Sequence, residues 1–157
     1  MIILGIDPGA SGGIAIWNGD KISKAIKCPK TPEEMSDIIL HYKTKAWIDN
    51  HDIVSFIEHV HAFPTDARSA AFKFGVNYGL WQGVLGANKI KRILIAPQVW
   101  MKYWKQKLDI EMPKNKQERK RKLKEIAAER TDLKVTLYNA DAILIALYGL
   151  DIERRVI

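Results

Sequence analysis

Apolar residues in the first third of this chain form short runs separated by polar or glycine-rich turns. Residues 2–7 and residues 53–60 are two such runs, rich in isoleucine and valine, and each carries a carboxylate at or near its end, Asp7 and Glu58. Apolar runs of this length with β-branched residues predict strands. Asn18-Gly19 is a two-residue hairpin signal between two further runs. Strands are expected at residues 2–7, 14–17, 21–27, 53–60 and 93–96.

Helical patterns occupy most of the remaining chain. Thr31 has the signature of a helix N-cap, because Pro32 follows it and Glu34 can complete a capping box. Helices are expected at residues 31–47, 69–87, 97–103, 115–130 and 140–150. Residues 135–137 are expected to be irregular or briefly extended, and the tail from residue 153 to be loosely held.

The helix expected at residues 69–87 is apolar on more than one side, which predicts that it is largely covered. It also contains four glycines, each of which costs roughly 1 kcal/mol relative to alanine in a helix interior. Close approach of its backbone to the sheet or to a partner subunit would offset that cost. Either arrangement makes this helix the central packing element. The glycines are Gly75, Gly79, Gly83 and Gly86.

The order of these elements predicts an α/β fold with a mixed five-stranded sheet and helices on both faces. A length of 157 residues fits one domain. No apolar stretch reaches the ~18 residues of a membrane span, and Met1 leads directly into a strand, so we expect a soluble, intracellular protein. The single cysteine, Cys28, excludes an internal disulfide and has no second ligand nearby for a zinc site.

The positive charge of the chain is concentrated in one segment. The formal net charge is +7, and residues 101–124 alone carry ten basic and three acidic residues, so the remaining 133 residues are neutral in sum. Such a concentration is expected of a surface that contacts a polyanion, although a solvated helix face is the alternative. With the acids described next, nucleic acid is the preferred partner.

Three acids stand at the ends of apolar elements, namely Asp7, Glu58 and Asp141. Each has an ordinary explanation: a turn for Asp7, a buried basic partner for Glu58, and the helix dipole for Asp141. Together they could converge on one edge of the sheet. Burying lone carboxylates is costly, and a shared Mg²⁺ or Mn²⁺ would compensate for it. Metal ions held in this way promote in-line attack on phosphate, so phosphodiester cleavage is the expected reaction.

Five motifs, in this order, resemble those of the RuvC-type Holliday junction resolvases, especially their phage-borne members. They are Gly5-Ile-Asp7-Pro-Gly9, Phe56-Ile-Glu58-His-Val60, Phe74-Gly-Val-Asn-Tyr-Gly79, Pro97-Gln-Val-Trp100 and Asn139-Ala-Asp141-Ala142. The resemblance implies an RNase H-like fold, a homodimer, and Mg²⁺-dependent paired nicking of four-way DNA junctions. It places the metal ligands on Asp7, Glu58 and Asp141. It also implies a cytoplasmic location in a bacterium or a phage-infected host.

One position departs from the family pattern. The family has a fourth ligand, Asp or His, about three residues before the last acid, and that position here is Tyr138. The neighbouring Asn139 could be a weak metal ligand through its amide oxygen, or the N-cap of the last helix. A branched-DNA-binding protein with weak or no nuclease activity is therefore the alternative function. A fragment of a sugar kinase or actin-like protein is a third, disfavoured because 157 residues leave no room for a second lobe.

The resemblance also assigns roles to basic and aromatic residues. Lys116 is the counterpart of a family lysine that approaches the scissile phosphate. Phe63 could stack at an open junction centre or pack in a satellite core, whereas His61 is expected to be a surface or DNA contact and not a ligand. Trp100, Tyr103 and Trp104 are expected in the core. The residues expected to bind DNA are Phe63, Lys102, Lys105, Lys107, Lys114, Lys116, Arg119 and Lys120.

Overall fold

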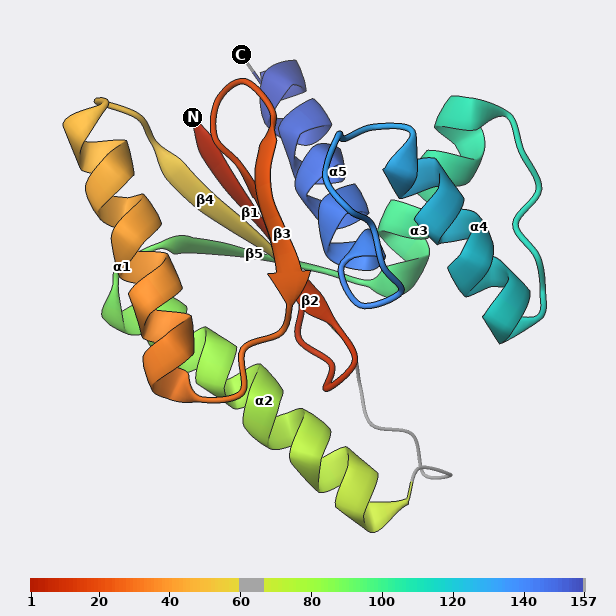
Figure 1. The fold of residues 1–157 in the computed structure, drawn as a ribbon, viewed down its shortest axis with the longest axis horizontal. Coiled ribbons are helices and arrows are strands. Elements are labelled where there is room, and N and C mark those ends of the chain that lie inside the picture. The colour runs from red at the N-terminus through yellow and green to blue at the C-terminus, as the bar shows by residue number, and fades with distance from the viewer. Residues whose placement is uncertain (60–66, 157) are drawn as a thin grey trace.

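The structure, a computed structural model, describes residues 1–59 and 67–156. Its centre is a mixed five-stranded sheet in the order β3-β2-β1-β4-β5 (Figure 1). β1 pairs antiparallel with β2 and parallel with β4, and β5 extends the parallel half. The expected sheet is therefore confirmed. The strands are β1 Ile2–Asp7, β2 Gly13–Trp17, β3 Ile22–Lys27, β4 Ile53–Glu58 and β5 Lys91–Ile95.

Helices cover both faces of this sheet, with α1 and α2 on one side and α3, α4 and α5 on the other (Figure 1). Successive residues of a strand point to opposite faces, so Ile2, Leu4 and Ile6 pack towards α1 and α2, while Ile3 packs towards α5. Both sides of β1 are consequently buried. The helices are α1 Pro32–Ile48, α2 Arg68–Ala87, α3 Pro97–Leu108, α4 Lys116–Ala128 and α5 Ala140–Val156.

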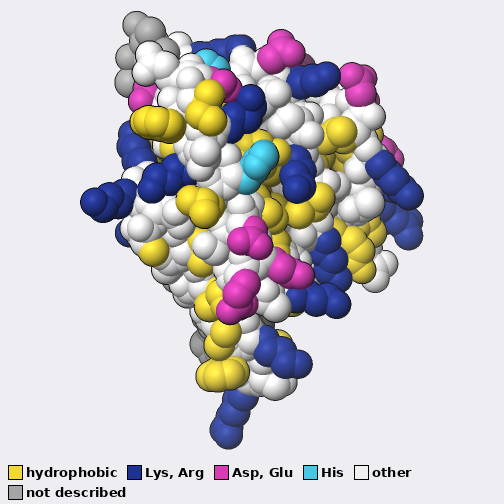
Figure 2. Space-filling model, turned by 60° about the vertical axis from the view of Figure 1, so that its left-hand side comes forward, with side chains coloured by type: hydrophobic (Ala, Val, Ile, Leu, Met, Phe, Trp, Pro, Cys, Tyr) yellow, Lys and Arg dark blue, Asp and Glu magenta, His cyan; other side chains and the backbone are white. Residues whose placement is uncertain are grey.

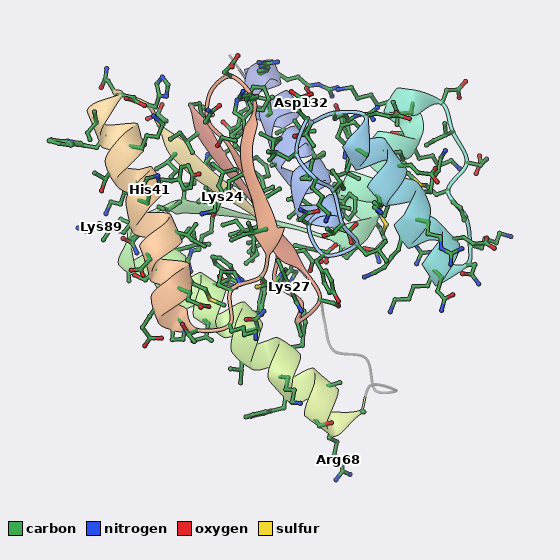
Figure 3. The ribbon with its side chains drawn as sticks, viewed as in Figure 1. Lys24, Lys27, His41, Arg68, Lys89 and Asp132 are labelled. Carbon is green, nitrogen blue, oxygen red and sulfur yellow. The ribbon has the colours of Figure 1, made fainter. Side chains whose placement is uncertain are left out.

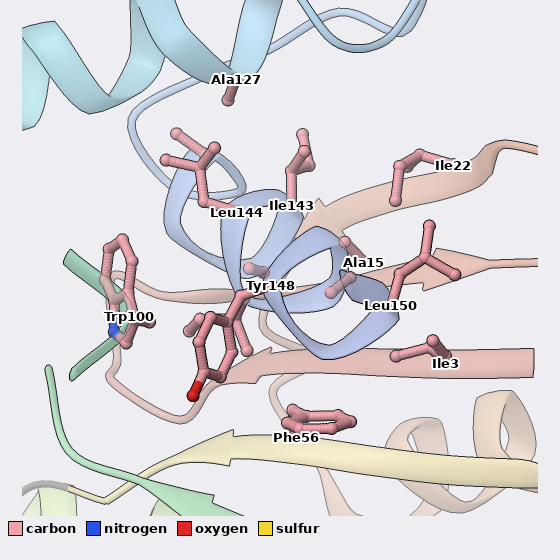
Figure 4. Close-up of a cluster of buried hydrophobic side chains, with 14 of the residues drawn as sticks. Ile3, Ala15, Ile22, Phe56, Trp100, Ala127, Ile143, Leu144, Tyr148 and Leu150 are labelled. Atoms are coloured by element: carbon pink, nitrogen blue, oxygen red, sulfur yellow. The ribbon is translucent and has the colours of Figure 1, made fainter. Parts of the chain in front are cut away.

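The contact between α5 and the sheet requires the absence of a side chain on β1. A Cβ added to Gly5 would lie 2.7 Å from Cβ of Ala146 and closer still to the backbone oxygen of Ala142. The rest of this layer is filled by aromatic and aliphatic side chains, such as Phe56, whose ring meets Tyr148 edge-on at 6.2 Å (Figure 4). Backbone contact at Gly5 therefore fixes the first turns of α5 against β1.

Several boundaries differ from the sequence expectation. The β2–β3 connection is a four-residue loop, residues 18–21, because the Asn18 side chain accepts hydrogen bonds from the backbone of Asp20 and Lys21. β4 ends at Glu58, and β5 begins at Lys91. α3 continues to Leu108, beyond the expected end at residue 103. Residues 135–137, expected to be either irregular or briefly extended, are irregular.

The tail from residue 153 was expected to be loosely held, and this was wrong, because α5 continues to Val156. Its basic residues pack on aromatic rings of neighbouring elements. The guanidinium of Arg154 lies 5.7 Å from the ring centre of Trp17, and that of Arg155 lies 5.7 Å from the ring centre of Tyr103. Cation–π contacts of this kind add stability to the last turn.

The glycine-bearing helix α2 was expected to be largely covered and central to the packing. Within a single chain this was wrong. Of the α2 side chains only Trp81 and Leu85 are buried, while Phe72 is 73% exposed. Among the described residues, no atom lies within 4 Å of a Cβ added at Gly75, Gly79 or Gly83. The N-terminal part of α2 projects from the body with hydrophobic and basic side chains on its surface (Figure 2).

No helix in the described part of the chain combines the length and apolar character needed to cross a bilayer.

Candidate active site

Two of the three acids lie side by side at the same end of the parallel strands. Ile6 of β1 pairs with Ile57 of β4, so the next residues, Asp7 and Glu58, end neighbouring strands together. By the alternation of side chains, Asp7 shares the α5 face with Ile3, and Glu58 shares it with Phe56. Strand register alone therefore places both carboxylates at one sheet edge and on one face.

The third acid, Asp141, begins α5 beside the same edge. Gly13 pairs with Asp7 across β1 and β2, and a Cβ added to Gly13 would lie 2.6 Å from the backbone oxygen of Tyr138 and 3.2 Å from Cα of Asn139. The chain thus enters α5 in contact with the strand that flanks Asp7. Together with the Gly5 contact, this brings the first turn of α5, and Asp141 with it, over the carboxyl end of β1.

Burial raises the pKa of all three acids, and the charge of Asp7 acts on the other two. Burial and then the negative charge of Asp7 are the main causes that raise the pKa of Glu58 from 4.5 to about 8. The same two causes, in the same order, raise the pKa of Asp141 from 3.8 to about 6. Burial also raises the pKa of Asp7, against a hydrogen bond from Gly9 and the charge of Lys120. Three partly buried carboxylates share one electrostatic environment.

Two of the acids are held by specific donors. The backbone N–H of Gly9 donates to Oδ1 of Asp7 at 3.0 Å. The indole N–H of Trp100 donates to Oε1 of Glu58 at 2.9 Å. The turn after Asp7 is also tied to α2, because the side-chain amide of Asn77 donates to the backbone oxygen of Pro8. Within the described residues, the Asp141 side chain makes no hydrogen bond or ion pair.

The donor set fits a hard divalent cation. Carboxylate oxygens are the ligands that Mg²⁺ prefers, and the mutual repulsion of the acids is what a cation would relieve. In the part of the chain that is described, no three His, Cys, Asp or Glu side chains are close enough to hold one ion jointly. Mg²⁺ is commonly bound through one or two carboxylates, with waters and substrate phosphates completing the shell. Asp7 and Glu58, on neighbouring strands, are the pair placed to supply them.

A lysine of α4 faces this cluster, one helical turn after the one expected. The positive charge of Lys120 lowers the pKa of Asp7, Glu58 and Asp141 alike, and Arg119 adds to the effect on Asp141. Lys116 is exposed in the first turn of α4, which is capped by the Asn115 side chain. The structure therefore favours Lys120 over Lys116 as the cation next to the acids.

The remaining basic residues expected to bind DNA divide into paired and unpaired groups. Lys105 bonds Glu111 at 2.7 Å, and Lys107 bonds Asp151 and stacks over the Trp104 ring. Arg119 donates to the backbone oxygens of residues 113 and 114, which braces the turn before α4. Lys102 and Lys114 are exposed. The Lys107 pair joins α3 to α5, whereas Lys102 and Lys114 form no ion pair with any described residue.

The position of the missing fourth acid has an unexpected environment. Tyr138 is 44% exposed, and the ammonium of Lys27 lies 4.4 Å from its ring centre. Lys27 ends β3 close to the start of α5 (Figure 3). A positively charged group therefore stands next to the residue that replaces the fourth ligand.

Asn139, expected to be a weak metal ligand or an N-cap, is buried and fully bonded. Its side-chain oxygen accepts hydrogen bonds from the backbone N–H and the hydroxyl of Thr136, and its nitrogen donates to the backbone of Ala25 and Lys134. By position Asn139 is the N-cap of α5, because its backbone oxygen accepts from the N–H of Ile143. Its side chain instead braces the turn before the helix. With its oxygen engaged by Thr136, Asn139 has a structural role.

Two residues considered in the sequence, Phe63 and His61, lie outside the described residues. His59 follows Glu58 and points to the opposite face of the sheet, where its Nδ1 lies 2.7 Å from the hydroxyl of Tyr78 in α2. The alternation along β4 therefore separates His59 from the acids.

No protein-family profile matches the chain, and no curated protein matches it in sequence. Solved structures do match in fold. RuvC from Thermus thermophilus, described alone, is 17% identical and superposes with a TM-score of 0.62 over 99% of this chain and 97% of its own. The same protein in complex with a Holliday junction substrate is 15% identical, with a TM-score of 0.61 over 99% of this chain and 96% of its own. The fold is that of RuvC.

A third neighbour is the yeast mitochondrial Holliday junction resolvase, 14% identical, with a TM-score of 0.51 over 98% of this chain and 81% of its own. The expected RNase H-like fold is therefore confirmed over nearly the whole chain. At these identities the likeness concerns the fold, and the site must be argued from this chain's own residues.

Sequence reasoning assigned Trp100 to the core and missed its bond to Glu58. Trp100 is a core residue and also a partner of Glu58, because its side chain is 1% exposed and its N–H donates to the carboxylate. A buried tryptophan needs an acceptor for its N–H. That need, with Trp100 in a motif starting just after β5, the strand next to β4, was the signal that could have found it.

Proposed function

We propose that this protein is a metal-dependent endonuclease that nicks branched DNA, with four-way junctions as its substrate. The proposal is carried by one observation, the gathering of Asp7, Glu58 and Asp141 at one sheet edge, where burial and the charge of Asp7 raise the pKa of the other two. The RuvC fold and the basic helix α4 beside this edge support it. RuvC itself is a protein described in complex with a Holliday junction.

In the proposed mechanism each residue has a separate role. Asp7 and Glu58 would hold Mg²⁺, for which Mn²⁺ would substitute, and the bound ion would supply Lewis-acid activation of the phosphate. Asp141 would accept a proton from the attacking water, since a pKa of about 6 makes it a base close to neutral pH. Lys120 stabilises the negative charge that develops on the phosphate oxygens. Exposed lysines of α3 and α4 position the DNA backbone without reading sequence.

The proposed assembly is a homodimer through α2. A two-fold dimer presents one active site to each of two opposed strands of a junction, which allows paired nicking. The exposed Phe72 and Val76, and the open stripe of Gly75, Gly79 and Gly83, would be covered by the same helix of a second copy. Phe72→Glu should give a monomer in analytical ultracentrifugation. A native protein that sediments as a monomer with junction DNA present would contradict this assembly.

The nuclease is tested by a nicking assay on labelled four-way junctions with Mg²⁺ or Mn²⁺. Glu58→Gln should abolish cutting and keep junction binding in gel-shift experiments. Glu111→Gln is the matched control, because Glu111 is exposed and pairs with Lys105 away from the acids. Linear duplex of the same sequence should remain uncut by all three proteins. Cutting by Glu58→Gln at the native rate would overturn the assignment.

The second candidate is a branched-DNA-binding protein with weak or no nuclease activity. It is favoured by Tyr138, which occupies the position where a fourth acid is expected and packs against the Lys27 ammonium. It is also favoured by Asn139, whose side-chain oxygen already accepts a hydrogen bond from Thr136. The same assay separates the two functions. Tight junction binding with no nicking by the native protein, in Mg²⁺ and in Mn²⁺, supports the binder.

A further inference from the structure

The hydrogen bond from Trp100 to Glu58 joins a core side chain to one of the proposed ligands. Trp100 is 1% exposed, and its Nε1 lies 2.9 Å from Oε1 of Glu58. The indole lies at the edge of the core between the sheet and α5 (Figure 4). Within the described residues, the second carboxylate oxygen of Glu58 accepts no hydrogen bond.

The backbone brings these two side chains together through β5. Glu58 pairs with Ile95, and α3 begins at Pro97, two residues further on. The first turn of α3 therefore rises beside the end of β4. Pro97 at the first helical position fixes the direction in which α3 leaves the sheet.

A second tryptophan on the same helix provides a comparison. Trp104 is also buried, and its Nε1 donates to the backbone oxygen of Leu144 in α5 at 3.1 Å. That bond satisfies a buried donor with a neutral acceptor, which is the usual arrangement. Trp100 instead donates to the carboxylate of Glu58, which lies close to the charge of Asp7. Packing of an indole does not require that acceptor.

We propose that Trp100 is a positioning residue for Glu58. Its N–H fixes one carboxylate oxygen and leaves the other directed to a divalent cation, so Trp100 contributes to metal affinity without touching the metal or the DNA. The inference rests on the proposed function, because it assigns Glu58 the role of a metal ligand. Groups that orient metal ligands in this way commonly change metal affinity or activity by 10- to 100-fold when removed.

The burial of the indole makes this hydrogen bond a fixed one. Because the Trp100 ring is packed in the core, its N–H keeps one place relative to the end of β4. Loss of the N–H would therefore weaken metal binding by freeing the carboxylate to rotate.

The test compares Trp100→Phe with Trp104→Phe, which removes a buried indole N–H from the same helix. Nicking of the labelled junction is measured against Mg²⁺ concentration. Trp100→Phe should shift the half-saturating Mg²⁺ upwards by about 10- to 100-fold. Trp104→Phe should keep the native value after correction for any loss of folded protein by circular dichroism. Equal Mg²⁺ curves for Trp100→Phe and the native protein would overturn the proposal.

A readout independent of activity uses the indole N–H resonances in ¹⁵N-labelled protein. The resonance that disappears in Trp100→Phe belongs to Trp100, and that of Trp104 is assigned in the same way. The Trp100 resonance should move in Glu58→Ala and on titration with Mg²⁺, each time more than that of Trp104. A Trp100 resonance that moves neither in Glu58→Ala nor on addition of Mg²⁺ contradicts the proposal. Should the native protein not nick junctions, the proposed function fails, and these resonances still decide whether Trp100 positions Glu58.

Discussion

The side-chain nitrogen of Asn139 lies 2.9 Å from the backbone oxygen of Ala25, which is 114 positions earlier in the chain. This bond ties the turn before α5 to the outer strand β3. Since Asp141 follows two residues later, the bond helps to fix the third acid relative to the sheet. A buried amide that makes four hydrogen bonds is a costly group to remove.

Asn139→Ala should destabilise the protein by about 2 to 4 kcal/mol, because buried partners in Thr136, Ala25 and Lys134 lose their bonds. Urea unfolding followed by circular dichroism measures the change. Asn88→Ala is the control, since among the residues described the Asn88 side chain makes a single bond, to the backbone of its own helix. Equal losses in the two variants would contradict the bracing role of Asn139.

Glu58→Gln should alter how stability depends on pH in metal-free protein. The pKa of Glu58 is raised from 4.5 to about 8, so between these values the folded protein retains a proton that the unfolded chain has released. The contribution to stability is complete below about pH 4.5 and is lost as pH rises through 8. Glu58→Gln should show a smaller fall in Tm from pH 5 to 8.5, measured in EDTA, by about 2–4 °C per kcal/mol relieved.

Asp49→Asn is the control for this pH series. Its hydrogen bond with Lys45 lowers the pKa of the exposed Asp49, so its contribution is lost only as pH falls. The slope above pH 5 should equal that of the native protein. If Tm falls equally with pH in the native protein and in Glu58→Gln, the pKa of Glu58 is not raised in the folded protein.

Lys120→Ala should slow nicking by about 100-fold at saturating Mg²⁺, because the variant lacks the cation that acts on all three acids. Lys116→Ala should have a much smaller effect on the rate and should mainly weaken junction binding. Lys122→Ala is the matched control, since Lys122 pairs with Glu125 on the same helix at 3.5 Å. A larger rate loss in Lys116→Ala than in Lys120→Ala would restore Lys116 as the catalytic lysine.

Gly5→Ala should destabilise the protein by about 1–3 kcal/mol, because the added methyl group would overlap the backbone of α5 at Ala142. Displacement of α5 would also move Asp141, so nicking by the folded fraction should fall. Gly86→Ala is the control: its Cβ would meet only the Arg92 guanidinium at 3.5 Å, and alanine favours the helix. Urea unfolding should therefore rank Gly86→Ala at or above the native protein.

The fold class and the meeting of Asp7 and Glu58 could be predicted from the sequence because both follow from strand physics. Short β-branched runs form strands, and parallel neighbours end at one edge. A period of two then puts residues 3, 5 and 7 on a common face. The capping box at Thr31 is likewise local, and the structure contains both of its hydrogen bonds.

The contacts between distant elements could not be predicted in this way. The bond from Trp100 to Glu58 depends on where α3 packs. The choice of Lys120 over Lys116, which share one helix face, depends on which turn of α4 lies beside the acids. The exposure of α2 was misjudged because an apolar helix covered by its own chain and one left for a partner have the same pattern. The bracing bonds of Asn139 were missed because their acceptors lie on β3 and in the preceding loop.

Tyr138, with the Lys27 ammonium above its ring, has a consequence for charge balance at the sheet edge. Asp7 and Glu58 alone would leave most of the coordination shell of one divalent ion unfilled, and Lys27 stands beside the position where a further acid is expected. Oxygens of the anionic sugar–phosphate chain would fill part of that shell. We expect full metal loading to occur only with nucleic acid in place, which would keep the free protein from hydrolysing phosphate esters indiscriminately.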